Sequence, residues 1–134
     1  MSSTRTIQDF DLTVTTALPA AAANADSASI DLEAIGPAAL ESVELEISLP
    51  ATPDLTDDDT ITLTIQDSAD DSTFASVEEL ATLVVTGAGG EGAAAASRKV
   101  RLPSSTKRYI NVNAAVLTGG GDNTDVSFTW KLLN

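Results

Sequence analysis

Alternation of apolar and polar residues in short runs is the feature that most constrains what this chain can fold into. In residues 43–49, VELEISL, every second residue is aliphatic and those between are Glu or Ser. Residues 60–66, TITLTIQ, repeat the pattern with threonines on the polar side. Because successive side chains of a β-strand point to opposite faces, each run predicts a strand with one buried and one solvated face.

The same alternation predicts further strands along the chain. Two are clear, at residues 107–116 and 125–133, and the glycine-rich residues 117–124 between them predict that these two strands form a hairpin. Weaker runs indicate strands within residues 10–18, 28–35, 81–86 and 98–103. The total is about eight short strands, a number typical of two-sheet β-proteins.

The predicted fold class is all-β, a jelly roll or related two-sheet β-sandwich. Residues 1–11 are interpreted as a flexible N-terminal arm and residues 12–134 as a single β-sandwich domain. Helical patterns last two turns at most, and the alanine-rich residues 20–28 and 90–98 lack a large apolar stripe, so loops or extended segments are expected there. The alternating positions predict a core that contains Val43, Leu45, Ile47, Ile61, Leu63, Ile65, Ile110, Val112, Phe128 and Trp130.

Composition removes many functions. The chain has no Cys and no His, so thiol nucleophiles, disulfides, most zinc sites and the usual general base near neutral pH are absent. Twenty acidic against seven basic residues give a formal charge of -13, which disfavours binding to nucleic acids and anionic membranes. No apolar run approaches the roughly 18 to 20 residues of a membrane span, and the N-terminal residues do not resemble a secretory signal. We expect neither an enzyme nor a cofactor-binding protein.

Two motifs have weak functional readings. Residues 87–92, GAGGEG, match the dinucleotide-binding spacing through Gly87, Gly89 and Gly92, but a strand-like segment follows where that motif needs a helix, so a flexible hairpin loop is expected. Aspartates form two clusters that could ligate calcium, namely Asp54, Asp57, Asp58 and Asp59, then Asp67, Asp70 and Asp71. Glu78 and Glu79, with the aspartate pairs, could act as paired catalytic carboxylates. The EF-hand pattern is incomplete and aromatic residues are few, so solvated turns are expected.

Basic residues are unevenly distributed. Five of the seven lie within eleven positions, namely Arg98, Lys99, Arg101, Lys107 and Arg108. The cluster is either a basic solvent face of neighbouring strands or an interface patch that orients a partner. The sequence leaves both interpretations open.

Residues 12–133 resemble the Bbp16-like capsid cement proteins of tailed bacteriophages. One shared feature is a polar turn after a strand, with Asp70 and Asp71 followed by Phe74, Ser76 and Leu80. A glycine- and alanine-rich stretch comes next, and then Leu102-Pro103 and Arg108-Tyr109 lead into a strand. These motifs are short and structural in character.

The resemblance implies a trimeric jelly-roll protein on the outer surface of a phage capsid, made in the host cytoplasm, which locks major capsid proteins together. The partners would be the major capsid protein and further copies of the chain. The cationic cluster, above all Arg98, Arg101 and Arg108, is the expected interface because guanidinium groups pair with carboxylates in bidentate fashion. The alternative is a β-sandwich carbohydrate-binding or adhesin module on a phage or cell surface.

Overall fold

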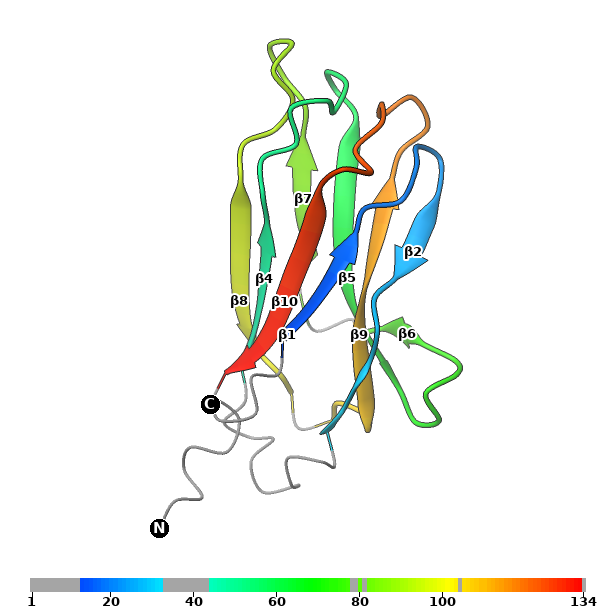
Figure 1. The fold of residues 1–134 in the computed structure, drawn as a ribbon. Helices are drawn as coiled ribbons and strands as arrows, with labels where there is room; N and C mark the ends of the chain where they lie inside the picture. Colours follow the sequence, from blue (N-terminus) through cyan, green and yellow to red (C-terminus); the bar gives the residue numbers. More distant parts are fainter. Residues whose placement is uncertain (1–12, 33–43, 78–79, 81, 104, 134) are drawn as a thin grey trace.

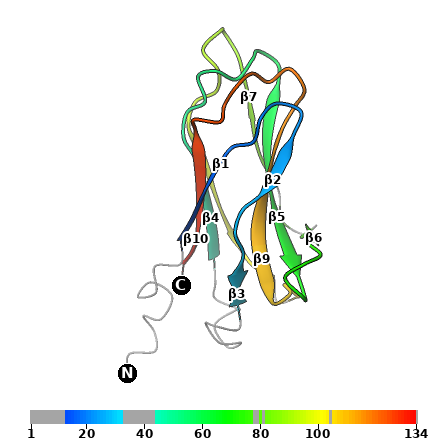
Figure 2. The same ribbon diagram turned by 45° about the vertical axis from the view of Figure 1, so that its right-hand side comes forward.

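Two antiparallel β-sheets packed face to face make up the fold (Figures 1 and 2). The computed structural model describes residues 13–32, 44–77, 80, 82–103 and 105–133, and this part of the chain contains no α-helix. Sheet 1 consists, in spatial order, of β1 (Thr13–Ala17), β10 (Ser127–Leu133), β4 (Glu44–Leu49) and β8 (Ala96–Arg101). Sheet 2 contains β2 (Asn24–Asp26), β3 (Ile30–Asp31), β9 (Tyr109–Val116), β5 (Thr60–Ser68), β6 (Ala75–Ser76) and β7 (Leu83–Thr86).

The strand order is that of a jelly roll. With the two-residue strands β3 and β6 set aside, eight strands remain, and the first pairs with the eighth, β1 with β10. Likewise the second strand pairs with the seventh (β2 with β9), the third with the sixth (β4 with β8) and the fourth with the fifth (β5 with β7). An antiparallel ribbon rolled up in this way gives two four-stranded Greek-key sheets. The predicted fold class is therefore confirmed.

The core lies between the two sheets and is built from the alternating positions. Trp130, Phe128 and Leu45 are fully buried from sheet 1, and Ile61 and Val112 from sheet 2. Val43, also predicted, lies outside the described residues. The other predicted core residues are buried as expected, namely Ile47, Leu63, Ile65 and Ile110. Period-two patterning thus identified the buried face of each major strand correctly.

The predicted hairpin between the last two long strands is wrong. β9 belongs to sheet 2 and β10 to sheet 1, so residues 117–126 cross from one sheet to the other. Gly119 and Gly121 adopt positive φ angles, as turn glycines do, but a ten-residue connection exceeds the two to five residues usual in hairpins. Alternation shows which face of a strand is buried and carries no information about which strand lies next to it.

All eight predicted strands have counterparts in the described residues, and β2 and β6 were not predicted. β2 occupies the alanine-rich stretch in which loops or extended segments were expected. The predicted arm, residues 1–11, lies outside the described residues. Residues 87–92 were expected to form a hairpin loop, but the connection that contains them, residues 87–95, also crosses between the sheets, from β7 to β8.

A buried serine joins the two sheets. Between β2 and β3, residues 27–29 oppose only two residues of β9, so one extra residue forms a bulge in the ladder. There the Ser27 hydroxyl oxygen accepts hydrogen bonds from the Val112 N–H at 3.1 Å and from the Trp130 Nε1–H at 2.9 Å. Val112 belongs to sheet 2 and Trp130 to sheet 1, so one hydroxyl satisfies a buried donor from each layer.

Four connections meet at one end of the sandwich, uppermost in Figure 1, which we call the upper end. They are residues 18–23, 50–59, 87–95 and 117–126. Backbone hydrogen bonds tie them together, since Thr52 and Ala93 bond reciprocally at 2.9 and 3.1 Å and the Ala22 N–H donates to the Val116 carbonyl at 3.0 Å. The upper end is therefore an interlocked set of loops.

Candidate interface surfaces

The predicted cationic cluster divides into two groups. Arg98, Lys99 and Arg101 lie on β8, an edge strand of sheet 1, and all three are exposed. Lys107 and Arg108 lie just before β9, which belongs to sheet 2. Nearness in the sequence therefore does not make one continuous patch, because the chain crosses between the sheets after β8.

The three cations of β8 differ in direction. Lys99 and Arg101 are in register with Glu46 and Glu44 of β4, on the outer face of sheet 1. Arg98 is in register with the buried Ile47, so its side chain leaves the strand on the face toward the other sheet. A charge that points inward on an edge strand is a recognised protection against pairing with a foreign strand. The position of Arg98 on β8 fits this arrangement.

Arg108 is already paired within the chain. Its Nε and Nη2 atoms each donate to a carboxylate oxygen of Asp31 at 3.0 Å, and the guanidinium lies 5.0 Å from the centre of the Tyr109 ring. The two charged side chains are 42% and 34% exposed, so the pair contributes little to stability. The Arg108 guanidinium therefore contacts Asp31 and lies over the Tyr109 ring at the surface.

The outer face of sheet 1 combines charge with small hydroxyl side chains. The Lys131 Nζ atom lies 3.6 Å from a carboxylate oxygen of Glu46, which is also opposite Lys99, so charges alternate across three strands. On the neighbouring row the hydroxyl oxygens of Thr15 and Thr129 are 3.2 Å apart. This row continues through Ser48 and Ser97, so its side chains are all short, and ordering them on binding costs little conformational entropy.

The upper end is strongly acidic. Its four connections contain seven carboxylates and no basic residue, and the acids are Asp54, Asp57, Asp58, Asp59, Glu91, Asp122 and Asp125. A hollow of about 450 Å³ there is lined by Asp54, Asp122, Thr124 and Asp125. The hydroxyl and the N–H of Thr124 hydrogen-bond to Asp122 and lower the pKa of its carboxyl. Sequence reasoning found only the first four acids, because nothing local indicates that distant loops share an end.

The second acidic cluster stabilises a turn. The Asp70 Oδ1 atom accepts hydrogen bonds from the Thr73 N–H, the Ser68 hydroxyl and the Ser72 N–H, which lower the pKa of Asp70 to about 2. Asp71 accepts a hydrogen bond from the Ser29 hydroxyl at 2.6 Å. These carboxylates accept hydrogen bonds from backbone amides and hydroxyls, as side chains of turn residues often do.

Asp67, from the same cluster, accepts a hydrogen bond from the Lys107 N–H at 3.0 Å. In the described part of the chain, no three acidic side chains are grouped so that they could hold a metal ion. Glu78 and Glu79 lie outside the described residues. The part of the chain that the structure describes also contains no helix long and apolar enough to cross a membrane.

The glycine-rich motif lies in the connection between β7 and β8. Gly89, Gly90 and Gly92 all have positive φ angles, and the backbone of Gly92 packs directly against that of Thr52 and Pro53. The segment that follows is strand β8, so the helix N-terminus that binds a pyrophosphate in dinucleotide sites has no counterpart here.

Comparisons with known proteins locate the fold but not the family. No family model matches the sequence, and no curated protein is significantly similar to it. The resemblance to capsid cement proteins therefore stays a prediction.

Three solved structures are similar in fold. The PBSX exported protein XepA has a TM-score of 0.52 at 16% identity, over 88% of this chain and 34% of that chain, so this chain spans about a third of XepA. A structure of Bacillus endospore appendages, described as disulfide-linked pili, has a TM-score of 0.51 at 17% identity, over 90% of this chain and 81% of that chain. PirA has a TM-score of 0.52 at 10% identity, over 92% of this chain and 94% of that chain.

Proposed function

We propose that this chain is a structural protein of a bacteriophage virion, a cement protein that binds the outside of the capsid as a homotrimer and has no enzymatic activity. The observation that carries the proposal is the jelly-roll strand order, found in a chain whose sequence resembles capsid cement proteins. The motifs of that resemblance lie at structural positions, because Asp70 holds the turn after β5 and Leu102 is buried just after β8.

One structural neighbour, the endospore appendages, is described as forming disulfide-linked pili, which are a structural assembly. This chain has no cysteine, so it cannot be held in an assembly by disulfides of its own.

A cement protein acts by mass action. A chain that binds only the assembled shell lowers the free energy of that state, and the gain grows with affinity and concentration. In a trimer the second and third contacts with the shell form at high effective concentration, so individually weak contacts give long occupancy. The row of short hydroxyl side chains on the outer face of sheet 1 suits contacts of this kind, since little rotamer freedom is lost there on binding.

The alternative, a carbohydrate-binding module, is less well supported. A sugar-stacking site needs exposed aromatic rings, whereas Trp130 is fully buried and Tyr109 is half-buried with Arg108 placed over its ring. We therefore favour the virion role.

The cationic cluster provides the test. Arg98→Ser and Arg101→Ser together remove the arginines of β8, while Arg108→Ser tests the second group separately, and Lys131→Ser is a matched loss of one positive charge on sheet 1. We expect the β8 variant to reduce occupancy on purified capsids with its β-fold intact by circular dichroism, and wild-type occupancy to fall as salt is raised. Full occupancy by the combined triple arginine variant would exclude the cluster as the capsid interface.

A further inference from the structure

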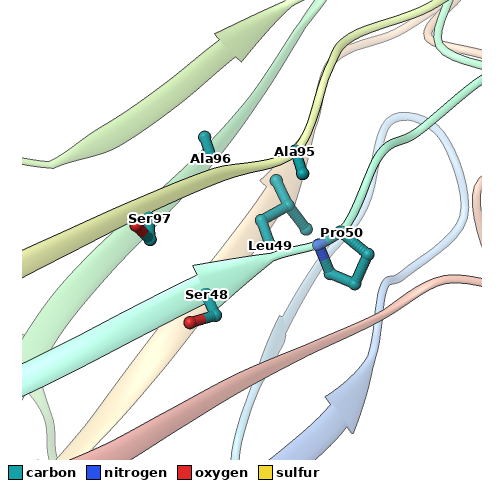
Figure 3. Close-up of a pocket in the computed structure, with 6 residues that line it drawn as sticks. All are labelled: Ser48, Leu49, Pro50, Ala95, Ala96 and Ser97. Atoms are coloured by element: carbon teal, nitrogen blue, oxygen red, sulfur yellow. The ribbon is translucent and has the colours of Figure 1, made fainter.

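A hollow of about 350 Å³ lies where the pairing of β4 with β8 ends (Figure 3). Leu49, Pro50, Ala95 and Ala96 give it apolar surface, and Ser48 and Ser97 add hydroxyl groups. In Figure 3 the Leu49 side chain extends across the gap between the two strands toward Ala95. Because the β8 side contributes only alanines and a serine, space remains for a side chain from outside the molecule.

One exposed leucine lies on another side of the molecule. Leu117 directly follows β9 and is 52% exposed. Its backbone is fixed, since its N–H donates to the Thr60 carbonyl at 3.2 Å and its carbonyl accepts from the Gly120 N–H at 3.0 Å. Val84, on β7, is the other large apolar side chain exposed within the described residues, at 49%.

Both features are at the upper end but on different sides. The hollow lies between β4 and β8, and Figure 1 shows these strands at the opposite side of the molecule from the upper end of β9, where Leu117 follows. If Leu117 of one copy contacts the hollow of another, the contact joins unlike surfaces of the two copies. Such heterologous contacts close into a ring when the rotation between copies fits.

Basic residues follow the hollow on β8, and an acidic residue lies beside Leu117. Arg98 and Lys99 follow the hollow directly on β8. Asp59 lies beside the Leu117 turn, because a side chain at Gly119 would meet its carboxylate oxygen at 3.4 Å and Thr60 bonds to Leu117. Opposite charges around a small apolar contact favour correct pairing and accelerate encounter.

We propose that Leu117 of one copy inserts into the β4–β8 hollow of a second copy, and that three such contacts close the homotrimer. The inference rests on the trimer of the proposed function and assigns its interface. It makes the hollow a binding site for the leucine of a neighbour, with the acidic upper loops of one copy against the cationic β8 of the next.

Sedimentation equilibrium of the full chain tests this interface. Leu117→Ser should raise the dissociation constant of the trimer at least tenfold, and Ala95→Phe, which fills the hollow from an exposed position, should do the same. Val84→Ser is the matched control, an equally exposed apolar side chain that the proposed contact does not use, and it should leave the trimer intact. Circular dichroism and thermal unfolding confirm that each variant is folded.

Mixing the two defective variants gives the sharper result. The Leu117→Ser chain keeps its hollow and the Ala95→Phe chain keeps its leucine. At a concentration at which each variant alone is monomeric, a mixture should therefore form a one-to-one heterodimer through one intact contact. A mixture that stays monomeric, or variants that still form trimers, would overturn the assignment.

Charge reversal adds a second readout that does not depend on packing. Asp59→Arg or Arg98→Glu alone should weaken the trimer, and the two changes together should restore it in part. If the double variant forms no more trimer than the single variants, the proposed pairing of these two surfaces is contradicted.

The inference and the proposed function can fail separately. A wild-type chain that is monomeric in solution but decorates capsids would refute the interface and leave the cement role intact. A trimer that depends on Leu117 but never binds capsids would support the interface and refute the cement role.

Discussion

Replacement of Ser27 by alanine should destabilise the fold far more than the loss of one hydroxyl on the surface. The Ser27 hydroxyl oxygen accepts hydrogen bonds from two buried donors, the Trp130 Nε1–H and the Val112 N–H, in an otherwise apolar core. A buried donor left without a partner costs about 1–3 kcal/mol. Two such donors, with some relaxation of the bulge around residue 27, predict a loss of about 2–4 kcal/mol in the free energy of unfolding.

Urea denaturation followed by fluorescence measures this loss directly, because Trp130 is the only tryptophan in the chain. A domain of ordinary stability has about 5–15 kcal/mol in total, so the predicted loss shifts the midpoint strongly. Ser97→Ala, at an exposed position on β8, is the matched control and should change stability by less than about 0.5 kcal/mol. A loss below about 1 kcal/mol for Ser27→Ala would refute the account of this residue as the link between the sheets.

A double-mutant cycle assigns the share that belongs to Trp130. Trp130→Phe removes the indole donor. In that background the loss in the free energy of unfolding caused by Ser27→Ala should be smaller than in the wild-type chain by about 1 kcal/mol or more. Circular dichroism follows unfolding in the cycle, because the fluorescent side chain is gone. Strictly additive effects would show that the two side chains are not coupled.

Three further substitutions test other parts of the structure. Asp70→Ala should lower the melting temperature at neutral pH. Because the pKa of Asp70 is about 2 in the folded chain against an ordinary 3.8, the difference in melting temperature from wild type should be full above about pH 4 and shrink as pH falls toward 2. A difference that does not depend on pH in scanning calorimetry would contradict this. Gly92→Ala should lower the free energy of unfolding by more than about 3 kcal/mol, because a β-carbon there collides with the Thr52 backbone. Gly90→Ala, in open space at φ +75°, should lower it by only about 1–2 kcal/mol. Equal losses for the two variants in urea denaturation would contradict the close approach at Gly92. Arg108→Ala should cost less than about 1 kcal/mol in the same assay, and a larger loss would mean that its exposed ion pair is more than a surface contact.

The sequence predicted the strands well because the information is local. Residues such as Leu45, Ile47 and Leu63 alternate with polar neighbours, and burial of one face follows from the geometry of a single strand. Strand partners are not local, and the hairpin expected between β9 and β10 failed because both strands bury the same kind of alternating face against one core from opposite sheets. β2 and Ser27 were missed because an alanine-rich stretch carries no alternation of large apolar residues.

The candidate surfaces were less predictable than the fold. Arg98 and Arg108 are ten positions apart, yet Arg98 lies on an edge strand of sheet 1 and Arg108 pairs with Asp31 beside sheet 2. The acidic upper end and the hollow beside β8 each combine segments that are distant in the sequence, so only the folded chain reveals them. Charge and composition set limits on function, but surfaces depend on topology.

Cryo-electron microscopy of capsids tests the cement role most directly. The capsids would be assembled from the major capsid protein of the same genome, with and without this chain. The account predicts threefold-shaped density on the outer surface only when the chain is present, into which three jelly rolls fit, together with greater resistance of those particles to heat. Capsids that look the same and resist heat equally with and without the chain would contradict the central claim.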